Sequence, residues 1–314
     1  MSSRAALPLA FVLLGVVVGV GAGLLREATV PSAMLLYAEP LPAVLGVWVV
    51  HLCFARGRWE AGVGAAIGTS CLLILARLSP PLDIPWAARG DAGATPVAAP
   101  CAVHASVPDS FILGLWSGAD DLGTISTLAD VADVLVLTDP DVDVERALAE
   151  AGGEVLSTPG ATWVWARGGF SLCGETGMWP VGRRSALVFA APGLDVSVPL
   201  LVTNLPALGE ELEAEVADVG AAAEAIGGDK LVVAGAGSFP TSFQRTDRRL
   251  AEAGLGALRL PPNAPSAWRG LPLVSVRSVN RVWSAAGWSD RAEVWRGGRA
   301  LRAPVLLRLD YQTP

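Results

Sequence analysis

Histidine is scarce in this chain, which contains only His51, inside an apolar run, and His104, in a stretch rich in proline, alanine and glycine. A serine nucleophile activated by histidine needs that base within hydrogen-bond reach. No histidine follows residue 104, so a histidine general base and a Ser–His arrangement are both excluded from the C-terminal two thirds of the chain. Asp and Glu remain open as bases.

Lysine is scarcer still, because Lys230 is the only one and all other basic residues are arginine. The 23 basic residues are outnumbered by 30 acidic ones, and the formal net charge is −7. Nucleic-acid binding relies on Lys and Arg to neutralise phosphates, so we expect no nucleic-acid partner.

Of the four cysteines, Cys53 and Cys71 lie in apolar runs, where Cys acts as a small hydrophobe. Only Cys101 and Cys173 are candidates for a disulfide, and whether they pair stays open.

Apolar residues are abundant, at 52% of the chain with a mean hydropathy of +0.47, above the roughly 45–50% of soluble domains. Residues 5–25 carry no charge and reach the length of about 20 residues that spans a bilayer. This run exceeds the ~7–15 residues of a signal-peptide core, which favours a retained anchor over a cleaved signal. Further spans are expected at 35–54 and 61–78, so residues 1–78 are predicted to form three transmembrane helices.

The arginines indicate the orientation of these spans. Arg4 precedes the first span, and Arg56 and Arg58 lie in the short turn between the second and third. Cytoplasmic loops are enriched in basic residues, whereas Arg26 and Arg77 on the other side weaken the asymmetry. We expect a multi-pass protein of the cytoplasmic (inner) membrane, in contact with membrane lipid, whose soluble domain is extracytoplasmic.

After the spans, residues 79–108 are rich in Pro, Ala and Gly and show no apolar period, as a linker does. Residues 109–314 alternate strand-like and helix-like segments, which predicts an α/β domain. Residues 208–226 form an amphipathic helix that buries Leu212, Val216, Val219 and Ala223. Other helices are expected near 121–131, 143–151 and 242–253, and strands at 111–116, 134–137, 163–166, 186–191, 196–203, 231–235, 276–283 and 303–309.

Three segments of this domain resemble parts of the endonuclease/exonuclease/phosphatase family. LVVAGAGSFPTSF, residues 231–243, resembles the strand that runs into Gly-Asp-Phe-Asn, whose Asp activates water and whose Asn orients the phosphate; Ala236 and Ser238 stand there. ADVLVLTDP resembles Asp-Val-Val-Xaa-Leu-Gln-Glu, whose Glu is the principal metal ligand, and puts Asp139 at that place. FILGLWSG puts Trp116 or Ser117 at the family's metal-site Asn.

Three further segments carry the resemblance in the same order. VPLLVTNLPAL resembles the strand ending in Thr-His-Leu, with Asn204 in place of the His that contacts the phosphate. SVNRVW resembles Ile-Asp-His-Val-Phe, with Asn280 and Arg281 in place of the Asp and its neighbour. GGRALRAPVLLRL resembles Gly-Ser-Asp-His-Xaa-Pro-Val, with Leu301 and Arg302 in place of the Asp–His pair. The resemblance implies a two-sheet α/β sandwich preceded by the three transmembrane helices.

The family's chemistry needs a divalent ion held by several oxygen ligands. Asp139 alone is a weak metal candidate, so we expect no cofactor, with Mg²⁺ or Mn²⁺ as the alternative. Arg281 and Arg302 are anion-binding candidates because they add positive charge where the family has carboxylates; surface arginines without a role are the competing interpretation. The Gly-Ala-Gly at 235–237 is no dinucleotide fingerprint, since residue 240 is Pro rather than Gly.

These residues predict a membrane-tethered pseudoenzyme that acts by binding or scaffolding, with an anionic envelope ligand or a protein as its partner. The alternative is a residual metal-dependent phosphodiesterase or phosphatase acting on envelope or lipid-linked phosphate substrates. A structural envelope protein without a ligand is a third hypothesis. If the resemblance holds, the residues at the family's site positions gather at one end of the sandwich: Asp139, Asn204, Ser238, Asn280 and Arg302.

Overall fold

The computed structural model describes residues 3–25, 40–78, 106–171, 176–193, 195–206, 210–226, 230–237, 240–258, 280–294 and 304–312. The chain separates into two compact units, Met1–Trp86 and Ala87–Pro314. Nearly all of the linker expected at 79–108 lies outside the described residues, as do Cys101 and Cys173. Each unit is considered by itself below.

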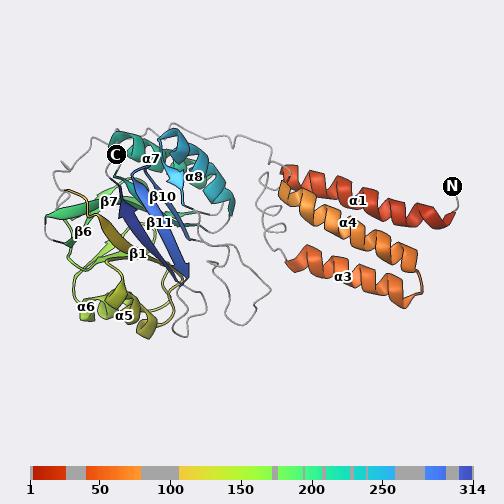
Figure 1. Ribbon diagram of the computed structural model, residues 1–314, viewed down its shortest axis with the longest axis horizontal. Helices are drawn as coiled ribbons and strands as arrows, with labels where there is room; N and C mark the ends of the chain where they lie inside the picture. The colour runs from red at the N-terminus through yellow and green to blue at the C-terminus, as the bar shows by residue number, and fades with distance from the viewer. Residues whose placement is uncertain are drawn as a thin grey trace. The chain divides into compact units, whose positions relative to one another are not determined.

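The N-terminal unit consists of the helices α1 (Ser3–Leu25), α3 (Pro40–Ala55) and α4 (Trp59–Leu78) (Figure 1). Within α1, Ala6–Leu24 is 19 residues long and apolar enough to cross a membrane. Among the described residues, the apolar segments of the other two helices are shorter, at Val44–Ala55 and Trp59–Leu75. One of the three expected spans is thus long and apolar enough, and this finding does not support a three-span region.

Glycines allow α1 and α4 to pack closely. A Cβ atom added to Gly15 would lie 2.1 Å from the carbonyl oxygen of Gly68, and one added to Gly64 would lie 2.5 Å from Pro8 Cα. Gly21, by contrast, has open space around the same position. Small residues at a helix–helix contact let the two backbones approach each other, so Gly15, Gly64 and Gly68 are needed for this pairing.

The C-terminal unit is a sandwich of two six-stranded mixed sheets. The first sheet has the order β11-β12-β1-β2-β4-β3, and the second has the order β5-β6-β7-β8-β10-β9. The first comprises β11 (Trp288–Val294), β12 (Val305–Tyr311), β1 (Ser110–Ser117), β2 (Val134–Thr138), β4 (Thr162–Ala166) and β3 (Glu154–Thr158). The second comprises β5 (Met178–Pro180), β6 (Ser185–Gly193), β7 (Val196–Leu205), β8 (Val232–Gly237), β10 (Asn280–Ser284) and β9 (Gly256–Ala257).

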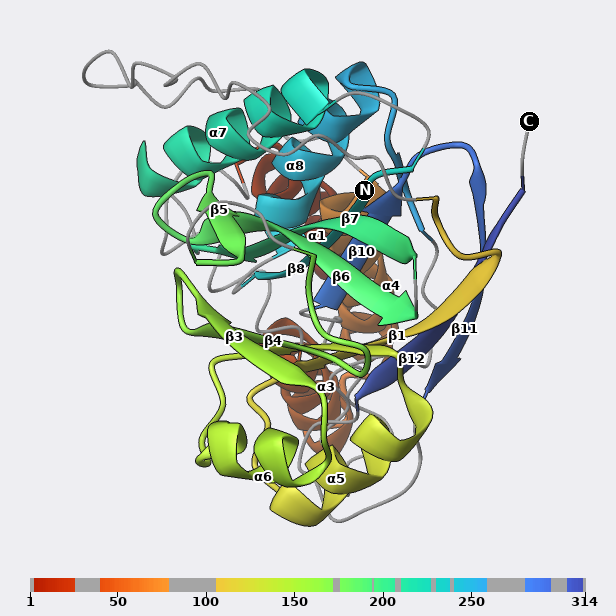
Figure 2. The same cartoon turned by 90° about the vertical axis from the view of Figure 1, so that its left-hand side faces the viewer.

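Helices cover the outer face of each sheet, as Figure 2 shows. α5 (Leu122–Val131) and α6 (Val144–Glu150) lie on the first sheet, whereas α7 (Glu210–Ile226) and α8 (Pro240–Glu252) lie on the second. The expected helices at 121–131, 143–151, 208–226 and 242–253 are confirmed within a few residues. The two-sheet α/β sandwich expected for residues 109–314 is therefore observed.

Alternation along the strands builds the core between the sheets. Side chains point to opposite faces at successive positions of a strand, and the inward set from both sheets forms one buried cluster that includes Leu113, Val136, Leu200, Val202 and Val282. Outward side chains of the second sheet, such as Leu201 and Val233, pack in one buried cluster with the α7 residues Leu212, Val216, Val219 and Ala223. The buried face expected for the 208–226 helix is confirmed.

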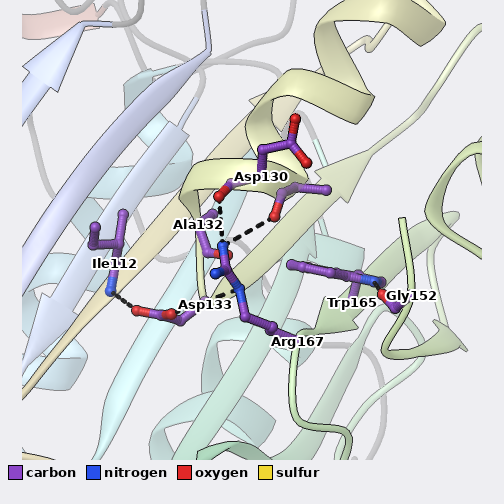
Figure 3. A network of polar contacts seen from close by, with 8 residues as sticks. Ile112, Asp130, Ala132, Asp133, Gly152, Trp165 and Arg167 are labelled. Atoms are coloured by element: carbon purple, nitrogen blue, oxygen red, sulfur yellow. Dashed lines mark hydrogen bonds and ion pairs between the residues drawn. The ribbon is translucent and has the colours of Figure 1, made fainter. Parts of the chain in front are cut away.

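Arg167, in the turn after β4, fastens the end of α5 to the first sheet (Figure 3). Its Nη2 donates to the carbonyl oxygens of Ala129 (3.1 Å), Asp130 (2.8 Å) and Ala132 (2.9 Å). The last carbonyls of a helix lack partners within the helix, and a cation at this end also complements the helix dipole. The two N–H groups of this one nitrogen are therefore shared among three backbone acceptors.

Candidate functional site

Three residues of the second sheet lie side by side at one end of its inner face. Asn204 of β7 pairs in register with Ala236 of β8, and Ala236 pairs with Asn280 of β10. Each lies two residues from a member of the inter-sheet core, namely Val202, Ala234 and Val282, so all three project between the sheets. Their exposed fractions are 4%, 2% and 4%, in the order Asn204, Ala236 and Asn280. We call these three residues the amide row.

A row of hydroxyls occupies the inner face of the first sheet. Ser117 of β1 pairs with Thr138 of β2, and Thr138 pairs with Thr162 of β4. All three are buried, and each continues the inward-facing set of its strand. The Oγ1 atom of Thr138 has no hydrogen-bond partner in the part of the chain that the structure describes. Ser117, Thr138 and Thr162 are the hydroxyl row below.

Asp139 and Asn204 join the two sheets at this end. Asn204 Nδ2 donates to Asp139 Oδ2 at 3.0 Å and to the carbonyl oxygen of Gly160 at 2.7 Å. Asp139 directly follows the hydroxyl row's Thr138, and its backbone N–H donates to the Ala161 carbonyl at 2.9 Å. Asp139 and Ala161 have φ angles of 45° and 54°, a left-handed conformation that is uncommon outside glycine and concentrates at functional sites.

This arrangement does not fit a divalent metal ion. Such ions take six or more oxygen ligands, usually several of them carboxylates. Asp139 offers one exposed carboxylate, and its Oδ2 already accepts the Asn204 amide. Among the described residues, no group of three or more His, Cys, Asp or Glu side chains is placed to hold a metal. We therefore derive no metal-dependent step for this site.

Arg184 also belongs to the site, although sequence reasoning did not single it out. Its carbonyl accepts the backbone N–H of Asn204 at 3.0 Å, and a Cβ atom added to Gly160 would lie 2.9 Å from Arg184 Cβ. It is two residues from the inward-facing Ala186, so it lies on the side of the amide row. Within the described residues, its guanidinium makes no ion pair or hydrogen bond.

A sequence signal for Arg184 does exist. Residues 183 and 184 are both arginine and directly precede the expected strand at 186–191, which is followed along the chain by the strand that ends at Asn204. Two successive strands with a short connection pair antiparallel, and the observed register sets Ser185 opposite Thr203. That pairing brings the start of β6 beside the end of β7, and hence Arg184 beside Asn204.

Arg281, expected to line the same opening, lies on the other face of β10. It alternates with the inward-facing Asn280 and Val282, and its Nη2 is 3.7 Å from Asp247 Oδ2 on α8. Asp247 also accepts from the indole N–H of Trp283, which belongs to the core under α7 and α8. The pleat of the strand therefore directs Arg281 to the helices and corrects its expected place in the site.

The remaining expected residues divide into two groups. Trp116 packs in the core under α5 and α6. Of the two residues that the family resemblance puts at the metal-site Asn, it is therefore Ser117 that faces the space between the sheets. Ser238, Leu301 and Arg302 lie outside the described residues. Asp139, Asn204, Ala236 and Asn280 thus come together at one end of the sandwich, from four different segments of the chain.

The chain is similar to several solved structures. An endonuclease/exonuclease/phosphatase family protein from Bacteroides thetaiotaomicron matches at 11% identity and a TM-score of 0.50, covering 66% of this chain and 100% of that one. The endonuclease domain of TRAS1, a telomere-specific non-LTR retrotransposon, matches at 10% identity and a TM-score of 0.45, covering 65% and 99%. No family model and no curated protein matches the sequence. The C-terminal unit has an endonuclease/exonuclease/phosphatase-type fold.

Proposed function

We propose that this protein is a membrane-tethered pseudoenzyme whose sandwich domain binds an oxyanion without metal and does not hydrolyse it. The observation that carries the proposal is the hydrogen bond from Asn204 to Asp139. The amide N–H takes one of the roughly four lone pairs of the Asp139 carboxylate, which leaves fewer of them for a cation. Asp139, which the family resemblance puts at the place of the metal ligand, therefore accepts a hydrogen bond from the protein itself.

A neutral donor and one arginine make the rest of the site suitable for an anion. Asn204 donates both of its side-chain N–H groups to Asp139 and Gly160, so the hydroxyl row supplies the neutral donor, namely Thr138 Oγ1, which is buried and has no hydrogen-bond partner among the described residues. Arg184 adds a guanidinium without an ion-pair partner among the described residues. Arginine binds phosphate and carboxylate through charge-assisted, often bidentate hydrogen bonds. We therefore propose an oxyanion such as a phosphate group as the ligand.

The residue at the family's base position supports binding rather than turnover. Hydrolysis of a phosphate ester needs a group that activates or orients water at the phosphorus. At the position where the family resemblance implies the water-activating Asp, this chain has the methyl group of Ala236, which is 2% exposed. The whole chain has no histidine after residue 104. These two features support a site that binds the anion without a following chemical step.

Membrane tethering is part of the proposal and is supported by α1, whose segment Ala6–Leu24 meets the length and composition of a span. Arg4, which precedes this segment, favours a cytoplasmic location for the start of α1, and one span then places the domain outside the cytoplasm. A periplasmic-type phosphatase reporter fused after Pro314 is expected to be active, and a fluorescent protein at the same point dark. The reverse pattern contradicts this topology.

A residual metal-dependent phosphodiesterase or phosphatase is the second candidate. The fold match to the Bacteroides thetaiotaomicron protein and the exposed position of Asp139 favour it. Metal dependence separates the two candidates, because hydrolysis by Asp139 needs Mg²⁺ or Mn²⁺ whereas anion binding by Arg184 does not. A structural envelope protein without a ligand is separated from both by the lack of saturable binding.

Calorimetric titration tests the proposed binding. The full-length chain in detergent micelles is titrated with inorganic phosphate in the presence of EDTA, beside Arg184→Gln and the control Arg146→Gln, whose side chain is 82% exposed on α6. We expect saturable binding that Arg184→Gln weakens by about tenfold or more, the value of one charge-assisted hydrogen bond, and that the control leaves unchanged. Equal affinities for all three proteins, or no saturable heat, contradict the proposal.

A further inference from the structure

Glu215 of α7 is a buried carboxylate with three donors around it. Its exposed fraction is 4%. Its oxygens accept the backbone N–H groups of Arg183 at 3.1 Å and Arg184 at 2.9 Å, and the hydroxyl of Ser185 at 2.5 Å. A buried carboxylate is tolerated where hydrogen bonds replace its lost hydration. These donors are consecutive in the chain, so one side chain of α7 holds the whole turn that leads into β6.

The turn is shaped around this carboxylate. A Cβ atom added to Gly182 would lie 2.6 Å from Glu215 Oε1, so no larger residue fits there without displacing the carboxylate. Ser185 Oγ also lies 2.8 Å from Thr203 Oγ1, on the neighbouring strand β7. Glu215, Ser185 and Thr203 therefore form a polar contact between α7 and the outer face of the second sheet, which is otherwise packed by apolar side chains.

The same backbone links Glu215 to the amide row. Arg184 donates its N–H to Glu215 on the outer face and accepts the N–H of Asn204 at its carbonyl. Asn204 in turn donates its side-chain amide to Asp139 and Gly160. The side chain of Arg184 leaves this fixed backbone next to Gly160. An unbroken series of hydrogen bonds thus runs from Glu215 through Arg184 and Asn204 to Asp139.

We propose that Glu215 is a positioning residue for the oxyanion site: by fixing the backbone of Arg183, Arg184 and Ser185, it sets where the Arg184 guanidinium meets the ligand. Glu215 does not touch the ligand, because its carboxylate lies on the helix side of the second sheet. This inference rests on the proposed function. A functional group is effective when its supporting contacts hold it in place, and the hydrogen bonds from Arg183, Arg184 and Ser185 supply that support.

A double-mutant cycle on the full-length protein in detergent tests the inference. Phosphate affinity is measured by calorimetry for the wild type, Glu215→Gln, Arg184→Gln and the double variant. Glutamine keeps the size of the side chain but turns an N–H₂ group towards backbone donors, so the turn loses at least one hydrogen bond. We expect Glu215→Gln to weaken binding by about tenfold and to have no further effect when Arg184 is already Gln, because coupled residues are non-additive.

Two further variants distinguish a specific loss of phosphate affinity from a general loss of protein stability. Ser185→Ala removes one donor to Glu215 and takes the place of Glu215→Gln if that variant does not fold; it is expected to show the same dependence on Arg184 with a smaller loss of affinity. Arg167→Met, which uncaps α5 on the first sheet, is expected to lower the melting temperature without changing phosphate affinity.

The possible results of these measurements distinguish failure of the proposed function from failure of this inference. A wild type that does not bind phosphate overturns both the proposed function and this inference. Binding that Arg184→Gln weakens, while Glu215→Gln is either silent or equally harmful with and without Arg184, leaves the proposed function intact and overturns the inference alone. A loss of affinity in Arg167→Met equal to that in Glu215→Gln also overturns it, because general destabilisation then accounts for the effect.

Discussion

Asn204 and Asp139, which are 65 positions apart, meet through a hydrogen bond of 3.0 Å between the side-chain amide and the carboxylate. The contact joins the end of β7 in one sheet to the loop after β2 in the other. A cation-binding arrangement would gather acceptors around the carboxylate, whereas here a donor faces it. The pairing therefore supports the proposal that an anion binds here without metal.

Asn204→Asp tests this pairing. The substitution sets a second carboxylate against Asp139, and two adjacent carboxylates resist ionising together. We expect a lower unfolding free energy at pH 7 that recovers as the pH falls and one carboxyl becomes protonated. Urea unfolding of the single variant and of Asp139→Asn/Asn204→Asp checks the result. The double variant restores one donor and one acceptor and should recover part of the loss; an equal or greater loss contradicts the assigned contact.

Arg167→Met tests the cap on α5. The three carbonyl hydrogen bonds are charge-assisted, and with the side chain 46% exposed their removal is expected to cost about 1–2 kcal/mol of unfolding free energy. Arg146→Met is the control, since its pair with Glu150 on α6 is exposed and worth about 0.5 kcal/mol or less. Equal losses in urea unfolding contradict the capping role.

Asp218→Asn tests the effect of pH on stability. Burial, and then the charge of nearby Glu215, raise the pKa of Asp218 above its ordinary 3.8. The folded state therefore holds this proton more tightly than the unfolded state, so stability falls as the pH rises from 3.8 through the raised pKa. We expect Asp218→Asn to raise the melting temperature at pH 7 and to have no such benefit below pH 3.8. A gain that does not change with pH contradicts this cause.

Gly15→Ala tests the close packing of α1 on α4. The added methyl group would lie 2.1 Å from the carbonyl oxygen of Gly68, so the two helices must separate. Gly21→Ala is the matched control on the same helix, because nothing lies within 4 Å of its added Cβ. Thermal unfolding in detergent, followed by circular dichroism, should show a lower midpoint for Gly15→Ala alone. Equal midpoints contradict the observed pairing.

Much of the fold could be predicted from apolar periodicity. The 208–226 helix carries a buried stripe at helical spacing, and the strands before Asp139, Asn204 and Ala236 are continuous apolar runs with few alternatives. The strands β3, β5, β9 and β11 were not expected. β3 lies at a sheet edge and most of its side chains are partly exposed, and β5 and β9 have only three and two residues. Their apolar alternation is therefore weak, and they form strands because a neighbouring strand pairs with them.

The site could be predicted in part. Sequence order placed Asp139, Asn204, Ala236 and Asn280 at the ends of strands, and strand ends converge in this fold. The face of β10 that carries Arg281 depends on register, since a shift by one residue moves a side chain to the opposite face. The place of Arg184 in the site depends on two long-range contacts, to Asn204 and Glu215, which a local sequence pattern does not predict.

Phosphate-ester hydrolysis is the measurement that tests the central claim most directly. The full-length protein in detergent is assayed with a generic phosphodiester and a phosphomonoester in Mg²⁺, Mn²⁺ or EDTA, beside Asp139→Ala. We predict rates that equal the protein-free background under all conditions, and no difference between the two proteins, because the site lacks both a metal cluster among its described residues and a histidine base. Metal-dependent turnover that Asp139→Ala abolishes would contradict the account and establish the residual enzyme instead.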